Sequence, residues 1–431
     1  MKYIQLILIF VTFSITTSCN NNQTNQITNT KDYSAYLNVS ENKPLINAEK
    51  EVAFWENKLL KTPNQYPYHA KIASAHSKIF KLTGVINNLK KAEKNLIATN
   101  QKTNYNSAGY LRSLAANYIS QHRFKEALEL LTEAEYNGEK LKQTHLMLVD
   151  VHLELGNMSK VEKYLSKVKN FKDFDYLIRI SKYNDHIGHL DNAIKYLEAA
   201  LTIAKSSNNR DLMQWNYTNL ADYYGHAGRI NDSYNAYLKA LAINPNNSYA
   251  KKGIAWIVYS YERNPKEALK ILKTVTKENA APDYHLLRAE IAGFMRDAVE
   301  KENQTKIYIA KVKDKNYGAM YAKYTVLLFA EEATHQSKAL EIAREEVAAR
   351  PTTQSYDLLA WSYYKKGSTE KALEISEKYV IGKTFEPEAL LHIAHILRAN
   401  GNQKEAQKLK VELLGAIYEL GLNSEQEIKD I

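Results

Sequence analysis

Hydrophobic and small residues in the middle of the chain have the spacing of two antiparallel helices joined by a turn. They lie at Leu220, Ala221 and Tyr224 before Gly228, and at Ser233, Tyr237 and Ala240 after it. Small residues at Ala221 and Ser233 would allow the two helices to approach closely. Pro245 would end the second helix, because proline cannot continue one. This pattern predicts a helical hairpin with its turn at Gly228.

The same spacing recurs along most of the chain. Ala127 and Val161 lie 34 positions apart, and so do Ala372 and Ala406. The sequence contains about eight such units from residue 108 to the end, with one poor match at residues 283–317. Further units are anchored by Ala193, Ala268 and Ala339. A fixed period of this length predicts a repeat protein whose units stack on one another.

Helix pairs with this period and with small residues at their crossing resemble the tetratricopeptide repeat. The resemblance implies an all-α fold, a right-handed superhelical solenoid of antiparallel helix pairs at residues 101–431. Residues 45–100 predict an N-terminal capping helix and a degenerate repeat. A second cap is expected near residues 408–420, since an end repeat has no neighbour to cover its apolar face. Repeats of this family build a groove for another molecule, which favours binding over catalysis.

The N-terminus carries a separate signal. Lys2 precedes an apolar run at residues 4–15, and small residues lead up to Cys19. The run is short for a membrane span but suits a secretory signal. The pattern resembles a bacterial lipoprotein signal peptide at residues 1–18, with lipidation of Cys19, although Thr16 departs from the leucine usual at that position. The alternative is an ordinary cleaved signal followed by an incidental cysteine.

Residues 19–44 are polar and predict a flexible tether. We therefore expect a lipid-anchored protein of the cell envelope, on the outer membrane, with its solenoid facing either the periplasm or the surface. Cys19 is the single cysteine, so an internal disulfide is excluded. The formal net charge of +10 favours acidic partners or anionic head groups. Nucleic acid is not an expected partner of a secreted lipoprotein.

Residues that could carry chemistry are few. His392 and His395 lie on one predicted helix and could share a metal, but the local sequence supplies no third ligand. His186 and His189 flank a turn at Gly188. Phosphate loops and nucleophile motifs are missing from the sequence. We therefore expect no catalytic residue, metal or cofactor.

In the resembling family, the first helix of each repeat lines the concave groove. Carried over repeat by repeat, this implies a partner-binding groove lined by Trp215, Thr218, Asp222, His226, Tyr261, Tyr321, Tyr324, Gln354, Asp357, Trp361, Tyr364, Lys365, Glu388, His395 and Arg398. Aromatic rings with a few polar groups suit a protein or peptide ligand. The alternative is that several of these rings fill the space between repeats, because the chain has 31 tyrosines.

Three classes of function follow. The leading one is a non-catalytic, lipid-anchored scaffold that binds a protein or peptide partner at the bacterial envelope. The second is a lipoprotein that captures a glycan or peptide substrate for an outer-membrane transporter. The third, an enzyme with a helical toroid, lacks support from catalytic motifs.

Overall fold

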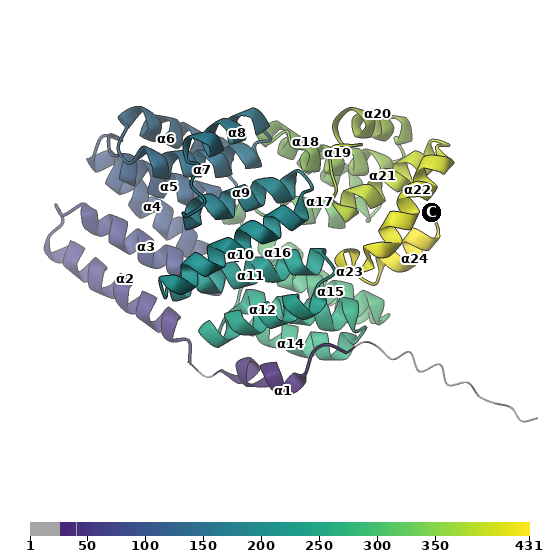
Figure 1. Cartoon of the computed structure of the whole chain (residues 1–431), viewed down its shortest axis with the longest axis horizontal. Coiled ribbons are helices and arrows are strands. Elements are labelled where there is room, and N and C mark those ends of the chain that lie inside the picture. Colours follow the sequence, from purple (N-terminus) through teal and green to yellow (C-terminus); the bar gives the residue numbers. More distant parts are fainter. Residues whose placement is uncertain (1–25, 40) are drawn as a thin grey trace, which may run out of the picture.

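The computed structural model describes residues 26–39 and 41–431, and every regular element within them is a helix. Consecutive helices pack as antiparallel pairs, and each pair packs on the next (Figure 1). The predicted all-α solenoid is therefore confirmed. The predicted signal peptide and the lipidation site at Cys19 lie outside the described residues. None of the described helices combines the length and hydrophobicity needed to cross a bilayer.

The repeats share one plan, a first helix followed by a second. The first helices are α3 (Pro67–Thr83), α5 (Ala108–Ser120), α7 (Leu141–Glu154), α9 (Phe174–His186), α11 (Arg210–His226), α13 (Ser248–Trp256), α15 (Asp283–Phe294), α17 (Ala322–Ala330), α19 (Thr353–Lys365) and α21 (Pro387–Ala399). The second helices are α4 (Ile86–Lys102), α6 (Phe124–Asn137), α8 (Met158–Lys167), α10 (Leu190–Ser206), α12 (Ile230–Ile243), α14 (Pro265–Glu278), α16 (Ala298–Val312), α18 (Gln336–Ala349), α20 (Thr369–Tyr379) and α22 (Gln403–Gly415).

Shorter elements and one further helix complete the chain. They are α1 (Thr30–Tyr33), the 3-10 helices η1 (Ser34–Asn38) and η3 (Lys315–Tyr317), α2 (Lys43–Lys61), the π-helical turn η2 (Ile257–Tyr261), α23 (Ile417–Leu420) and α24 (Ser424–Lys429). Helix α2 packs along α3 at the start of the solenoid. The poorly matched stretch at residues 283–317 forms a regular pair, α15 with α16.

The small residues that set the sequence period lie where the helices of a pair cross. All of them are fully buried: Ala127, Val161, Ala193, Ser233, Ala268, Ala339, Ala372 and Ala406. The turns before two of these positions use glycine with a positive φ, +83° at Gly367 and +82° at Gly401. Glycine adopts this conformation without the steric cost that other residues meet. The repeat register read from the sequence is therefore the register of the core.

The solenoid closes on itself, because later repeats return to lie against earlier ones. The amide of Ala280 donates to the carbonyl of Thr83 at 2.7 Å, which joins the α14–α15 loop to the end of α3. Two repeats further on, Arg350 forms an ion pair with Glu154 at 3.2 Å. Arg350 directly follows α18, and Glu154 is the last residue of α7. These contacts join late repeats of the solenoid directly to early ones.

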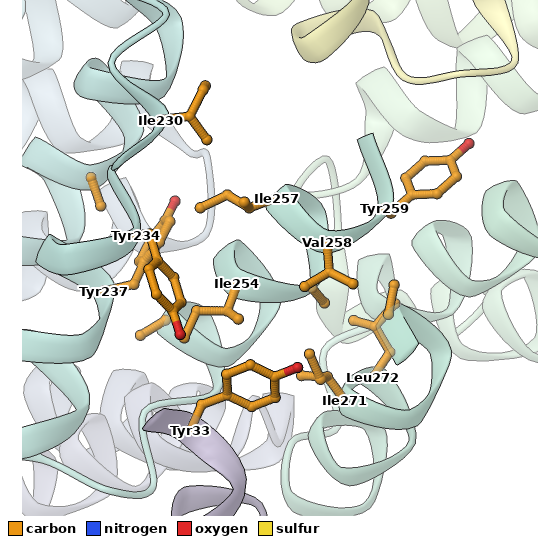
Figure 2. Close-up of a cluster of buried hydrophobic side chains, with 14 of the residues drawn as sticks. Tyr33, Ile230, Tyr234, Tyr237, Ile254, Ile257, Val258, Tyr259, Ile271 and Leu272 are labelled. Atoms are coloured by element: carbon orange, nitrogen blue, oxygen red, sulfur yellow. The ribbon is translucent and has the colours of Figure 1, made fainter. Parts of the chain in front are cut away.

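Residues 27–38 do not form the flexible tether that their polar composition predicts. The backbone amides of Ile27 and Thr28 donate to Glu262 at 2.7 and 2.5 Å. Tyr33 is 1% exposed and inserts into the hydrophobic cluster around Ile254 and Ile271 (Figure 2). The prediction was wrong here because a few apolar side chains, with one carboxylate receiving the amides, suffice to dock a short segment.

The C-terminal end also differs from the single capping helix expected at residues 408–420. The chain leaves α22 after Gly415 and continues through α23 and α24. Helix α24 covers α22, with Ile428 fully buried beside Leu413. Helix α23 instead crosses to η2. Capping and closure of the solenoid are thus performed by two different short helices.

Candidate partner-binding cavity

First helices from the middle and the end of the chain surround a cavity of about 630 Å³, called here the inner cavity. Helices α11, α13, α15 and α17 supply most of its wall, and α23 and the residues at the start of α21 close it. Its lining comprises Asp222, Tyr223, His226, Tyr237, Tyr249, Lys252, Gly253, Trp256, Asp283, Leu286, Leu287, Glu290, Lys323, Tyr324, Glu386, Pro387, Glu388, Tyr418, Glu419 and Leu420.

Helical periodicity explains which residues reach the inner cavity. Asp222 and His226 lie four positions apart on α11, and Tyr249, Lys252 and Trp256 follow the same face of α13. Residues three or four positions apart share one face of a helix. The first helices therefore direct these side chains to the inner cavity, and the second helix α12 adds Tyr237.

Two tyrosines hold the carboxylate of Asp222. The hydroxyl of Tyr237 donates to Oδ1, and that of Tyr249 donates to Oδ2 at 2.7 Å. Burial raises the pKa of Asp222, although both hydrogen bonds oppose the rise. A Cβ atom on Gly253 would lie 2.1 Å from the ring of Tyr237, so only glycine leaves room for this ring. The site is thus built by a close backbone approach as well as by polar contacts.

Ion pairs connect parts of the cavity wall that are distant in sequence. Lys323 contacts Glu388 at 2.7 Å, and His226 contacts Glu419 at 2.5 Å. Burial disfavours both charges of the first pair, yet their attraction prevails: the pKa of Glu388 is lowered and that of Lys323 is raised. Lys252 lies 4.9 Å from the centre of the Tyr249 ring. Each cation of the wall already faces a carboxylate or an aromatic ring.

Two further carboxyl groups are shifted toward their neutral forms. Burial raises the pKa of Asp283, while the charge of Lys252 opposes the rise. Burial also raises the pKa of Glu290 to about 8, although the neighbouring Tyr259 hydroxyl lowers it. A neutral carboxylic acid can donate a hydrogen bond as well as accept one. The inner cavity therefore offers hydroxyl, carboxyl and aromatic groups for recognition.

The structure brings four of the residues predicted for the groove into the inner cavity, namely Asp222, His226, Tyr324 and Glu388. Two more lie beside it. Tyr321 packs against Tyr324 with ring centres 6.3 Å apart, and Tyr261 packs against Tyr418 at 6.4 Å.

Three predicted residues are buried in the packing between helices. Thr218 donates to the carbonyl of Trp215 at 2.8 Å. Asp357 accepts from His392 at 2.9 Å, and Trp361, 4% exposed, stacks on His392 with ring centres 4.1 Å apart. The ring of Trp361 is therefore covered by other residues of the chain. This agrees with the alternative interpretation, in which some of the predicted rings fill the space between repeats.

The remaining predicted residues lie away from the inner cavity. Trp215 is 41% exposed and packs edge-on against Phe174, and Tyr364 stacks on Trp361. The other four are polar. Gln354 is exposed, and Lys365 pairs with Glu331. His395 lies beside Glu427, and Arg398 donates to the carbonyl of Asp430. His392 and His395 thus face different carboxylates. No cluster suited to a metal ion occurs among residues 26–39 and 41–431.

Sequence reasoning missed most of the cavity wall on α13, α15 and the C-terminal segment. Tyr249, Lys252 and Trp256 could have been found, because they continue the helical face that selects Asp222 and His226. Tyr418 and Glu419 could not, since they follow the last repeat and enter the interior only when the solenoid closes.

Comparison with known proteins agrees with the repeat pattern. A family model described as tetratricopeptide repeat matches residues 174–207 and 216–247. No curated protein sequence matches this chain significantly.

Solved structures with similar helical arrays include the human IFIT1 dimer with PPP-AAAA, at 14% identity and a TM-score of 0.47, with 76% of each chain covered. The human IFIT1 dimer with m7Gppp-AAAA gives the same identity and TM-score and covers 76% of this chain and 75% of that one. Likenesses this weak transfer neither ligand nor function. The matched residues form α9 to α12, and the protein thus contains tetratricopeptide repeats within an all-α solenoid.

Proposed function

We propose that this protein is a non-catalytic scaffold that binds a protein or peptide partner in the inner cavity. The main support for this proposal is the inner cavity, which the first helices of the repeats line with tyrosines and oriented carboxyl groups. Aromatic rings contribute large contact area at low entropic cost, and they dominate the energetics of many interfaces. A chain segment with side chains that match this lining is the ligand that suits it best.

Site-specific crosslinking tests this function. A photoreactive residue replaces Tyr324 in the cavity wall, and the same residue replaces Tyr136, 88% exposed on the second helix α6, as the matched control. We expect one envelope protein to be crosslinked from position 324 and not from position 136. Equal capture at both positions, or capture at 136 alone, would show that the partner lies elsewhere.

Binding of the captured partner can then be measured with purified proteins. Tyr249→Ala should weaken binding by about 2 kcal/mol, because truncation of a central aromatic residue at an interface typically costs this much. Tyr136→Ala should leave the affinity unchanged. Unchanged affinity in the Tyr249 variant would count against the inner cavity as the binding site.

The envelope location rests on the sequence around Cys19, and the proposed function includes lipid attachment there. One acyl chain attaches a protein to a membrane only weakly, whereas several chains anchor the protein stably. Cys19→Ser should therefore move the protein from the membrane fraction to the soluble fraction without unfolding it. Retention of the variant on membranes after a high-salt wash would argue against lipid anchoring.

A second candidate, capture of a glycan, is favoured by a cavity of about 990 Å³ between α2, α3, the start of α11 and the α12–α13 loop. Amide and hydroxyl side chains such as Gln214, Asn246 and Ser77 contribute to its wall. Calorimetric titration of oligosaccharides into the protein tests this candidate. Binding that Gln214→Ala weakens would support it, and the absence of heat would exclude the sugars tested.

A further inference from the structure

Residues 417–425, called here the inner segment, lie across the first helices of the middle repeats. They contact α11, η2 and α15, and the same first helices line the inner cavity. We infer that the inner segment is an intramolecular ligand, and that the partner of this surface is a peptide with an aromatic residue followed by an acidic one. This inference rests on the proposed function and adds the chemical class of the partner.

Side chains of the repeats bind the main chain of the inner segment. The carbonyl of Tyr418 accepts from Trp256 Nε1 at 3.0 Å and from Ser260 Oγ at 2.8 Å. Helix α23 has four residues, and the amide of Gly421 takes the carbonyl of Ile417, which leaves the carbonyl of Tyr418 available to the repeats. At the far end the roles are reversed, because the side-chain amide of Asn423 donates to the main-chain carbonyl of Glu290 at 2.9 Å. The inner segment is thus held by its backbone at Tyr418 and by a side chain at Asn423.

The side chains of the inner segment meet complementary groups. The ring of Tyr418 lies over Gly225, where an added Cβ would come within 3.1 Å of it. Glu419 pairs with His226 at 2.5 Å, and Glu425 pairs with Arg263 at 2.9 Å. Leu422 is 3% exposed and belongs to the main hydrophobic cluster.

These contacts specify an order of chemical groups, namely aromatic, acidic and aliphatic. Gly225 leaves space for the aromatic ring because it has no side chain, and His226 beside it pairs with the acidic group. Tyr418 and Glu419 also form part of the cavity wall. A partner with the same groups would therefore compete with the inner segment, and the segment would weaken its binding.

A peptide with the sequence of residues 415–425 tests the inference. Its binding is measured by fluorescence anisotropy to the parent chain and to the variant Tyr418→Ala/Glu419→Gln, in which the inner segment is weakened. We expect at least about 10-fold tighter binding to the variant, a difference of about 1.4 kcal/mol. A control peptide with alanine at the positions of Tyr418 and Glu419 should not bind. Adding Ser260→Ala should weaken the interaction again.

Circular dichroism establishes that each variant is folded. If the double variant unfolds, Glu419→Gln alone replaces it, because this change keeps the shape of the side chain. Equal binding of the peptide to the parent and to the folded variant, or binding to neither, would overturn the inference. If crosslinking at position 324 captures a partner but the peptide does not bind, the inference is wrong and the proposed function stands. If the peptide binds but crosslinking captures no partner, the proposed function is wrong.

Discussion

The imidazole of His226 on α11 lies 2.5 Å from the carboxylate of Glu419 on α23, although 193 residues separate the two. Burial opposes the charge of the imidazole. The hydrogen bond and charge of Glu419, together with the charges of Asp222 and Asp185, outweigh burial and raise the pKa of His226 to about 9. This pair joins the middle repeats to the end of the chain and carries a proton at neutral pH.

The pair makes stability depend on pH in the alkaline range. The pKa of His226 is about 9 in the folded chain and about 6.5 for an unperturbed histidine, so its stabilisation is complete below about pH 6.5. It is lost as the pH rises through about 9. We expect the free energy of unfolding to fall over this window, and Glu419→Gln to reduce the fall. Urea unfolding at several pH values measures it.

Glu425→Gln is the matched control for this experiment. It breaks an ion pair of the same inner segment, but its partner Arg263 stays charged across the whole window. This control should keep the pH dependence of the parent. A Glu419→Gln variant with the parent's pH dependence would show that His226 does not titrate as stated.

Enlarging the small residues at helix crossings should destabilise the fold. Ala221 and Ala406 are fully buried, so Ala221→Leu and Ala406→Leu should each cost about 1–3 kcal/mol through forced backbone shifts. Chemical denaturation measures the loss. Ala116→Leu, at an exposed position of α5, serves as control and should stay within about 0.5 kcal/mol of the parent. Equal stability of all three variants would contradict the repeat register.

The two tryptophans Trp361 and Trp215 should behave differently on truncation. Trp361→Ala removes a ring that is 4% exposed and stacked on His392, so it should cost about 3–5 kcal/mol. Trp215 is 41% exposed, and its replacement by alanine should cost about 1 kcal/mol or less. Denaturation curves of both variants decide between a packing role and a surface role. A mild effect at Trp361 would return this residue to the candidate binding surface.

Gly253 should be intolerant of even a methyl group. Replacing glycine by alanine inside a helix usually stabilises by about 0.5–1 kcal/mol. At Gly253 the new Cβ would lie 2.1 Å from the ring of Tyr237, so Gly253→Ala should instead destabilise by about 1–3 kcal/mol. Gly415→Ala, which meets no atom within 4 Å, should stabilise or be neutral. A stabilising Gly253→Ala would refute the close approach of the two helices that shapes the cavity.

Much of the fold could be predicted from the sequence because the repeat is a local signal. Small residues one period apart mark the helix crossings, and each of those positions is buried in the structure. The candidate site was predicted only in part. Asp222 and His226 were predicted from the face of one first helix, and both line the inner cavity. Trp361 was predicted from the same kind of position on another first helix, but His392 covers its ring.

The sequence by itself determined the helix pairs and their order along the chain. These properties depend on periodicity within about one repeat, which local patterns express. Tertiary structure alone decided that the later repeats return to the earlier ones, that residues 27–38 dock on η2 and its neighbours, and that Tyr418 and Glu419 enter the interior. Such contacts join residues more than 150 positions apart, and they form only after small differences in the packing of successive repeats have added up to a closed superhelix.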